Sequence, residues 1–261
     1  MKGIITLPLV PLRESENEQS ELVSQLLFGE RVEIIEKRER WLFVRNLTDD
    51  YRGWVDRKMI QTLSDSINEQ IVKVTKYIIQ VPIIICNKTA TNEKMFLPGG
   101  SILNADGYGK FAVGAETFSL DPVELVLPVE ITGWKLIQLA RQYLNAPYLW
   151  GGKSIMGIDC SGLVQIVFAM CGIQLPRDAS EQIERGNIID FLSESREGDL
   201  AFFENKEGRI VHVGILLNSH QIIHASGCVK IEDIDTQGII SSQTGKYTHQ
   251  LRIVKRIILT N

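Results

Sequence analysis

The chain has 261 residues, of which 28 are Lys or Arg and 32 are Asp or Glu, giving a formal net charge of -4. This balance argues against a nucleic-acid coat or a polybasic membrane anchor. With 44% hydrophobic and 23% charged residues, the composition is that of a globular protein and excludes intrinsic disorder. The longest apolar stretch, residues 77–86, contains Gln80 and Pro82 and is much shorter than the about 20 residues of a membrane span. We therefore expect at least two globular domains and no transmembrane helix.

The N-terminus begins with an apolar run over residues 3–12 that follows Lys2, as in a short leader peptide. Pro8 and Pro11 interrupt this run, and no small-residue cleavage pattern follows it. We expect the first strands of a folded domain here, and a cytoplasmic protein, or a periplasmic or exported one if a leader peptide has been removed.

Residues 4–120 consist of short apolar runs separated by turn residues, a pattern typical of all-β structure. Val32 and Ile34, for example, alternate with charged residues. A shift of 70 residues places Gly29 on Gly99, together with a few other matches, as two similar small β domains would. The polar residues 64–73 predict a short helical link between them.

A change of pattern follows residues 121–130, where Pro122 and Pro128 indicate an extended linker. Thr132 is then typical of the N-cap of a helix. The apolar face of this helix consists of Leu136, Ile137, Ala140, Tyr143 and Leu144.

A second helix is predicted from residue 160 to Cys171, where Gly172 and Pro176 stop it. Strands are predicted at residues 199–203, 210–217, 221–226 and 251–259. Two helices followed by antiparallel strands indicate an α+β domain. The expected domains are residues 1–63, 64–128 and 129–261.

Four cysteines in a chain of this length are too few for a disulfide scaffold, and none forms a Cys-x-x-Cys pair, so we expect free thiols. Cys160 differs from Cys86, Cys171 and Cys228 because it begins a predicted helix with Asp159 as its cap. The positive end of a helix dipole favours a thiolate. The alternative, a buried small side chain, is assigned to Cys171. Ser161 is a poor nucleophile candidate because Asp-Cys-Ser-Gly is not a G-x-S-x-G elbow.

The four histidines show no zinc-binding spacing, so neither a metal nor another cofactor is expected. His212 lies on a predicted strand and shares its face with Gly214, which leaves room for a substrate. His224 lies on the next strand and faces the same side if the loop contains a bulge, so that it can orient His212. His220, in a turn, and His249, in a polar loop, are assigned ordinary structural roles.

Four motifs occur in order in the second half of the chain: Tyr-Leu-Trp-Gly-Gly at 148–152, Asp-Cys-Ser-Gly-Leu-Val at 159–164, Gly-Asp-Leu-Ala-Phe-Phe at 198–203, and His-Val-Gly-Ile at 212–215. Together they resemble the NlpC-type cell-wall cysteine peptidases, papain-like enzymes of bacterial peptidoglycan. Residues 25–30 and 51–55 resemble the bacterial SH3-like domains of one subgroup of that family. The resemblance implies a multidomain fold in which two small all-β SH3-like barrels are followed by an α+β papain-like cysteine peptidase domain.

The resemblance also implies roles for individual residues. Cys160 would be the nucleophile, His212 the base and His224 the polar third member. Tyr148 would border the oxyanion site, and Trp150 would form a wall of the pocket.

Further substrate contacts are implied by the same resemblance. Asp159 would hold the substrate amine and Ser161 the glutamyl carboxylate. Asp178 and Ser180 would also bind substrate, although the family pattern Arg-Asp-Ser here reads Arg-Asp-Ala-Ser at 177–180 and shifts the serine by one position. Tyr51, with an acidic residue for which Glu14 and Glu16 are guesses, would close the site over the amine.

The subgroup cuts the γ-D-glutamyl to diamino acid bond of murein peptides that carry a free N-terminal L-alanine. The implied partner is therefore a murein peptide, with no nucleic acid and no membrane. The alternatives are a noncatalytic peptidoglycan-binding protein, a wall endopeptidase acting on intact peptidoglycan, and an acyltransferase. Whether lysine replaces diaminopimelate is left open by the sequence.

Overall fold

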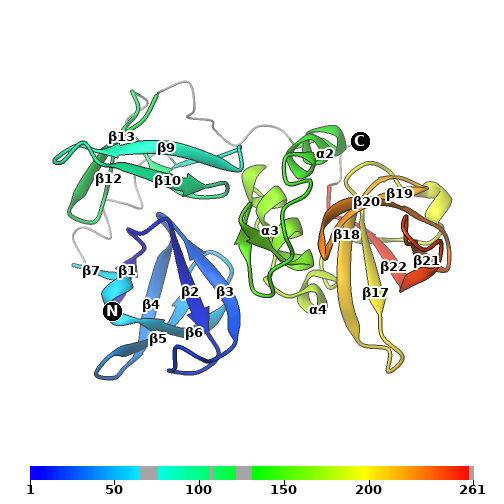
Figure 1. Cartoon of the computed structure of the whole chain (residues 1–261), viewed down its shortest axis with the longest axis horizontal. Coiled ribbons are helices and arrows are strands. Elements are labelled where there is room, and N and C mark those ends of the chain that lie inside the picture. The colour runs from blue at the N-terminus through cyan, green and yellow to red at the C-terminus, as the bar shows by residue number, and fades with distance from the viewer. Residues whose placement is uncertain (65–75, 106–107, 122–130, 259–261) are drawn as a thin grey trace. The chain divides into compact units, whose positions relative to one another are not determined.

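The computed structural model describes residues 1–64, 76–105, 108–121 and 131–258 (Figure 1). The chain divides into two compact units, one of Met1–Val129 with Trp150–Ser154 and one of Glu130–Leu149 with Ile155–Asn261. The predicted helical link at 64–73 and the linker at 121–130 lie almost entirely outside the described residues. The boundaries between three domains therefore stay predictions.

The first β domain is a seven-stranded antiparallel sheet in the order β3-β2-β6-β5-β4-β1-β7. Its strands are β1 (Lys2–Ile4), β2 (Leu9–Arg13), β3 (Leu22–Leu27), β4 (Arg31–Lys37), β5 (Trp41–Asn46), β6 (Arg52–Asp56) and β7 (Gln61–Leu63), with the 3-10 turn η1 (Arg57–Met59). Strands β1 and β2 occupy the apolar run near the N-terminus, as predicted. In β4 the alternation of Val32 and Ile34 with charged residues places both side chains in the core.

The second β domain repeats the topology of the first. Its strands are β8 (Lys76–Ile78), β9 (Ile83–Lys88), β10 (Lys94–Pro98), β11 (Ile102–Asn104), β12 (Lys110–Val113) and β13 (Glu116–Ser119). The order β10-β9-β13-β12 corresponds to β3-β2-β6-β5, and the pair β11-β8 corresponds to β4-β1. The internal repeat is therefore real.

Glycines at equivalent turns show the register of this repeat. Gly29 and Gly100 both have positive φ, 81° and 84°, so the shift is 71 residues at this turn rather than 70. Gly29 is also a point of close approach, because a Cβ there would lie 1.9 Å from the carbonyl oxygen of Ile102. Phe28 beside it packs edge-on against Phe111 and Phe118 in the core of the second β domain.

The second unit has α+β structure, as predicted. Its helices are α2 (Gly133–Arg141), α3 (Cys160–Met170) and α4 (Ala179–Gln182), with the 3-10 turn η3 (Leu192–Glu194). Its strands are β15 (Gly157–Ile158), β16 (Asn187–Ile189), β17 (Leu200–Glu204), β18 (Ile210–Asn218), β19 (Gln221–Ser226), β20 (Cys228–Ile234), β21 (Gly238–Ile240) and β22 (Tyr247–Arg256). The sheet order is β16-β22-β17-β18-β19-β20-β21, and β22 also pairs with β21, so the sheet closes on itself.

The helices of this unit begin where the sequence predicts. The Thr132 hydroxyl accepts a hydrogen bond from the Lys135 amide at 3.1 Å and caps α2. Helix α3 is buried on almost every side and packs against β18, β19 and α2 (Figure 1). Within the described ranges, no helix combines the length and the apolar character needed to cross a membrane.

Candidate active site

Cys160 is the first residue of α3. The Asp159 carboxylate caps this helix by accepting a hydrogen bond from the Gly162 amide at 2.7 Å. The Cys160 side chain is buried, and its sulfur accepts a hydrogen bond from the amide of Val213, the residue after His212. The structure thus confirms that Cys160 lies at a helix N-terminus beside the strand of His212.

The protonation state of Cys160 differs from the one expected at a helix N-terminus. Burial and the adjacent Asp159 carboxylate raise the pKa of the Cys160 thiol to about 11, although the amides of Val213 and Ser161 and the Arg177 guanidinium oppose this effect. Burial, with His249 and His224 nearby, lowers the pKa of His212 well below 6.5. Both shifts favour a neutral thiol and a neutral imidazole in the resting pair.

His212 and His224 lie on one side of the closed sheet, as predicted. Nε2 of His212 lies 2.9 Å from Nδ1 of His224, and the ring planes are nearly perpendicular, at 87°. A register shift between Leu216 and Asn218 provides the bulge that the prediction required. His224 is completely buried, so its ring is fixed beside that of His212.

Ile222 and His224 fill the space beside Gly214, which corrects the interpretation that its small size leaves room for a substrate. A Cβ at this position would lie 3.0 Å from Cβ of His224 and 2.7 Å from Cδ1 of Ile222. A larger residue would therefore require the Ile222 side chain or the Cβ of His224 to shift.

Glu232 of β20 extends the histidine pair, and sequence reasoning missed it. Its Oε2 lies 3.0 Å from Nε2 of His224, and its side chain is completely buried. Register explains the contact, because His224 pairs with Lys230 and Ile222 pairs with Glu232, so all four share a face of the sheet. The sequence did contain a signal for this contact, because Glu232 is an acidic residue at an even spacing after His224 on the following strand.

His249 is also part of this cluster, contrary to its assignment to a polar loop. It lies in β22, and its ring stacks on that of His212 with centroids 4.1 Å apart. The nitrogens of His212, His224 and His249 lie within 4.8 Å of one another. However, both ring nitrogens of His224 are engaged in hydrogen bonds. The rings of His212 and His249 are stacked, so their nitrogen lone pairs lie in nearly parallel planes and do not converge on one point. The geometry is that of a hydrogen-bonded chain rather than of a metal-ligand set.

Arg177 is a second residue that sequence reasoning missed, although it lies beside Asp178. It is 1% exposed and donates to both carboxylate oxygens of Asp159, at 3.0 and 2.5 Å, and to the Ser161 hydroxyl at 2.8 Å. A buried guanidinium therefore lies next to the start of α3. In the free protein Asp159 serves as helix cap and ion-pair partner, and its contact with a substrate amine stays a prediction.

Other predicted residues of this unit are placed differently. Burial raises the pKa of the Tyr148 phenol to about 12, with smaller contributions from Cys160 and Asp159. Asp178 is half-buried at the N-cap position of α4. Ser180 is exposed, whereas Ala179 before it is buried. This position does not support a role for Ser180 in place of the family serine.

Trp150 and Tyr51 belong to the other unit, so the expectation that they border the Cys160 site stays a prediction. The indole nitrogen of Trp150 donates to Glu21 at 2.5 Å. Tyr51 is half-buried against the core of the first β domain. Of the two acids considered from the sequence, Glu16 pairs with Arg38, and Glu14 is exposed.

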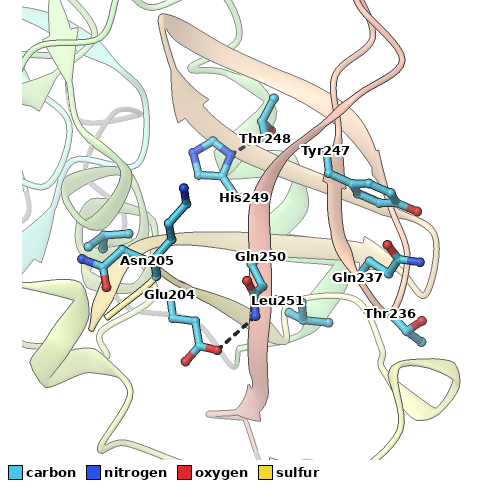
Figure 2. Close-up of a pocket in the computed structure, with 11 residues that line it drawn as sticks. Glu204, Asn205, Thr236, Gln237, Tyr247, Thr248, His249, Gln250 and Leu251 are labelled. Atoms are coloured by element: carbon cyan, nitrogen blue, oxygen red, sulfur yellow. Dashed lines mark hydrogen bonds between the residues drawn. The ribbon is translucent and has the colours of Figure 1, made fainter. Parts of the chain in front are cut away.

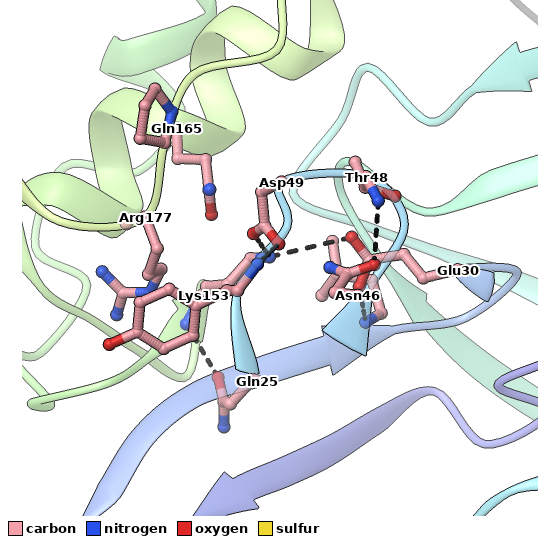
Figure 3. A network of polar contacts seen from close by, with 12 residues as sticks. Gln25, Glu30, Asn46, Thr48, Asp49, Lys153, Gln165 and Arg177 are labelled. Atoms are coloured by element: carbon pink, nitrogen blue, oxygen red, sulfur yellow. Dashed lines mark hydrogen bonds and ion pairs between the residues drawn. The ribbon is translucent and has the colours of Figure 1, made fainter. Parts of the chain in front are cut away.

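Lys153 fixes the segment that contains Trp150 to the first β domain (Figure 3). Its buried ammonium lies 3.8 Å from Glu30 and 3.9 Å from Asp49, and its amide donates to Gln25 at 2.7 Å. Burial raises the pKa of Glu30, and the charge of Lys153 opposes this effect. A buried ion cluster therefore anchors residues 150–154.

A cavity of about 700 Å³ opens next to the histidine cluster (Figure 2). His249 contributes to its wall, and Nδ1 of this residue lies 2.9 Å from the Thr248 hydroxyl. Other lining residues include Glu204, Asn205 and Lys206.

A cysteine at the start of a buried helix, packed on an antiparallel sheet that carries its histidines, defines a cysteine peptidase of the papain-like class. Comparison with protein families agrees, because residues 145–250 match the NlpC/P60 family and residues 12–60 match the bacterial dipeptidyl-peptidase Sh3 domain. The chain belongs to the NlpC/P60 family and has an N-terminal bacterial SH3 domain.

Two curated relatives align with most of this chain. The γ-D-glutamyl-L-lysine dipeptidyl-peptidase of Bacillus cereus is 26% identical over 87% of this chain and 74% of its own. Dipeptidyl-peptidase 6 of Lysinibacillus sphaericus is 29% identical over 91% of this chain and 93% of its own. A crystal structure of an NlpC/P60 family protein from Bacillus cereus matches with a TM-score of 0.85 at 18% identity, covering 98% of this chain and 99% of that one. This match shows the fold, with β-rich SH3-type regions before the α+β domain.

Proposed function

We propose that this NlpC/P60 peptidase hydrolyses the γ-D-glutamyl to diamino acid bond of murein peptides that begin with a free L-alanine. The observation that carries the proposal is the placement of Cys160 at the start of α3 beside the paired His212 and His224. The substrate class is supported by two relatives of matching architecture, one named a γ-D-glutamyl-L-lysine dipeptidyl-peptidase and the other a dipeptidyl-peptidase.

The reaction begins with proton transfer from the Cys160 thiol to His212. Nε2 of His212 faces His224, so Nδ1 is the nitrogen that takes the proton. The thiolate attacks the γ-glutamyl carbonyl, and His212 then donates the proton to the leaving amine of the diamino acid. Water, deprotonated by His212, hydrolyses the resulting thioester and regenerates the thiol. We assign Tyr148, whose pKa is raised by Cys160 after the larger effect of burial, to the border of the developing oxyanion.

The glutamyl residue offers a free α-carboxylate, because it is linked to the diamino acid through its side-chain carbonyl. We assign recognition of this carboxylate to Arg177 and the Ser161 hydroxyl, which lie together at the start of α3. Arginine suits this role because its planar guanidinium stays charged when buried. Asp159 holds the guanidinium through two hydrogen bonds and fixes its orientation.

The free N-terminal amine requires an anionic acceptor. We assign this role to Tyr51 with Glu21, rather than to Glu14 or Glu16. Glu21 already holds the indole of Trp150, whereas Glu16 is paired with Arg38. A role in recycling released murein peptides, in the cytoplasm, is a further proposal, because the alanine amine is free in such peptides and amide-linked in intact peptidoglycan.

Mass spectrometry of products from L-alanyl-γ-D-glutamyl-meso-diaminopimelate and from its L-lysine analogue tests the proposal. The expected products are L-alanyl-D-glutamate and the free diamino acid. A ligated product in the presence of an added amine would indicate an acyltransferase instead. Binding without any product would indicate a noncatalytic protein, and the Cys160→Ala variant provides the baseline for that comparison.

A further inference from the structure

Glu232 uses its two carboxylate oxygens differently. Among the described residues, Oε2 accepts a hydrogen bond only from His224, whose Nε2 lies 3.0 Å away. Oε1 accepts from the amide and hydroxyl of Ser242, at 3.0 and 3.2 Å, and lies 3.2 Å from the ammonium of Lys230. These donors keep the carboxylate ionised although it is buried, in line with a pKa below the usual range of Glu.

An ionised carboxylate can only accept hydrogen bonds, so the proton between Glu232 and His224 belongs to Nε2 of His224. Nδ1 of His224 then presents its lone pair to Nε2 of His212, 2.9 Å away. Nε2 of His212 must therefore carry the second proton. Nδ1 of His212 is left without one and is ready to accept the proton of the Cys160 thiol.

We propose that Glu232 is a positioning residue that sets the tautomers of both histidines and so prepares His212 as the base. The proposal rests on the assignment of Cys160 and His212 made above. Glu232 touches neither the thiol nor the substrate and acts through two hydrogen bonds in series. Once His212 has taken the proton, the fixed negative charge of Glu232 also compensates the imidazolium.

The unequal surroundings of the two oxygens make the effect of Glu232→Gln specific. Ser242 and Lys230 supply donors only to the Oε1 position, so they hold the amide oxygen there. The amide NH₂ then faces Nε2 of His224 and donates to it. This moves the His224 proton to Nδ1, and Nε2 of His212 must become an acceptor. The His212 proton moves to Nδ1, the position where a proton blocks attack by Cys160.

Nitrogen-15 NMR of the full chain with labelled histidines reads these tautomers directly. We expect Nε2–H on both His212 and His224 in the wild type and Nδ1–H on both in Glu232→Gln. Loss of individual signals in His212→Gln, His220→Gln and His249→Gln variants assigns three of the four histidines and leaves His224 by elimination. A wild-type His224 protonated on Nδ1, or tautomers unchanged in Glu232→Gln, would overturn the proposal. The spectra need no substrate, so they stand or fall independently of the proposed peptide hydrolysis.

Kinetics supplies the second readout. We expect kcat of Glu232→Gln to fall by about tenfold or more, with little change in KM. This loss should be smaller than the about 10⁴-fold seen when a carboxylate that directly contacts the catalytic histidine is replaced and the histidine adopts the wrong tautomer. Glu232→Asp retains an acceptor and should recover part of this loss. If Glu232→Gln does not fold, the wild-type tautomers and Glu232→Asp still decide the question.

Asp199 offers a matched control. It is a carboxylate of the same unit, also buried, that pairs with Arg256 and lies outside the histidine chain. Asp199→Asn should lower the thermal midpoint but leave the histidine tautomers and kcat unchanged. An equal fall of kcat in Asp199→Asn and Glu232→Gln at similar stability would show that Glu232 is only structural and would overturn the proposal.

Discussion

The imidazole of His249 stacks on that of His212, with centroids 4.1 Å and planes 25° apart. Positive charges on the two rings would repel each other. Burial is the larger cause of the lowered pKa of His212, and His249 lowers this pKa further. Hydrolysis requires His212 to be neutral, so kcat/KM should fall as the pH decreases through the pKa of this residue. Because that pKa is below 6.5, the acid limb should lie below pH 6.5.

His249→Phe keeps a ring in the stack and removes the charge. The pKa of His212 should then rise, and the acid limb of kcat/KM should move to higher pH, by roughly one unit or less. The pH profile of hydrolysis measures this shift. His220→Gln, at an exposed turn, is the control and should leave the profile in place. A shift to lower pH in His249→Phe would contradict the predicted electrostatic role.

Cys160→Ala should abolish hydrolysis and leave the fold intact, whereas Cys228→Ala, at a half-buried free thiol, should remain active. Circular dichroism and product analysis test both. Because burial raises the pKa of the Cys160 thiol to about 11, alkylation of the wild type by iodoacetamide should accelerate from pH 7 to 10. A rate that is already at its plateau at pH 7 would indicate a preformed thiolate.

His212→Ala removes the base and should reduce kcat by about 10²- to 10⁴-fold. His224→Ala should reduce it less, since His224 acts on the thiol only through His212. Single-turnover assays of the two variants compare these effects. A more severe loss in His224→Ala would require the two assignments to be exchanged.

The sequence predicted those parts of the site that depend on adjacent residues or on the alternation of side chains along a strand. Asp159 as a cap and Cys160 as the first helical residue follow from adjacent residues, and His212 and His224 follow from strand alternation. His249 was not predictable in the same way, because β22 comes from the end of the chain and its pairing with β17 contains a shift between Phe202 and Phe203. Placing His249 over His212 therefore depends on closure of the sheet.

Glu232 and Arg177 illustrate the same limit. The hairpin that turns at Gly227 places Glu232 on the face of His224, but only its register shows this. Arg177 was visible beside Asp178, yet nothing local distinguished a buried arginine from an exposed one. In α4, the burial of Ala179 and exposure of Ser180 likewise depend on packing.

Lys153→Met should destabilise the first unit, because it leaves Glu30 and Asp49 buried without their ammonium. Breaking a buried ion pair in this way costs about 3–5 kcal/mol. Urea unfolding should show the loss, and proteolysis should become faster at residues 150–154. Lys153→Met combined with Glu30→Gln should recover part of the stability. Full stability of the single variant would show that the ion cluster does not anchor this segment.

N-acetylation of the substrate's alanine provides the sharpest test of how the enzyme selects peptides. A buried ammonium without an acceptor is unfavourable by several kcal/mol, so a site with a phenol and a carboxylate for this group should select strongly for a free amine. We expect the acetylated peptide to be cleaved far more slowly than the free one, and Glu21→Gln to reduce this difference mainly by slowing cleavage of the free peptide. Glu18→Gln is the matched control, since Glu18 is an exposed acid of the same loop that pairs with Arg40. Equal cleavage of both peptides by the wild type would mean that the amine is not recognised, and the protein would then act as an endopeptidase on intact, amide-linked peptidoglycan.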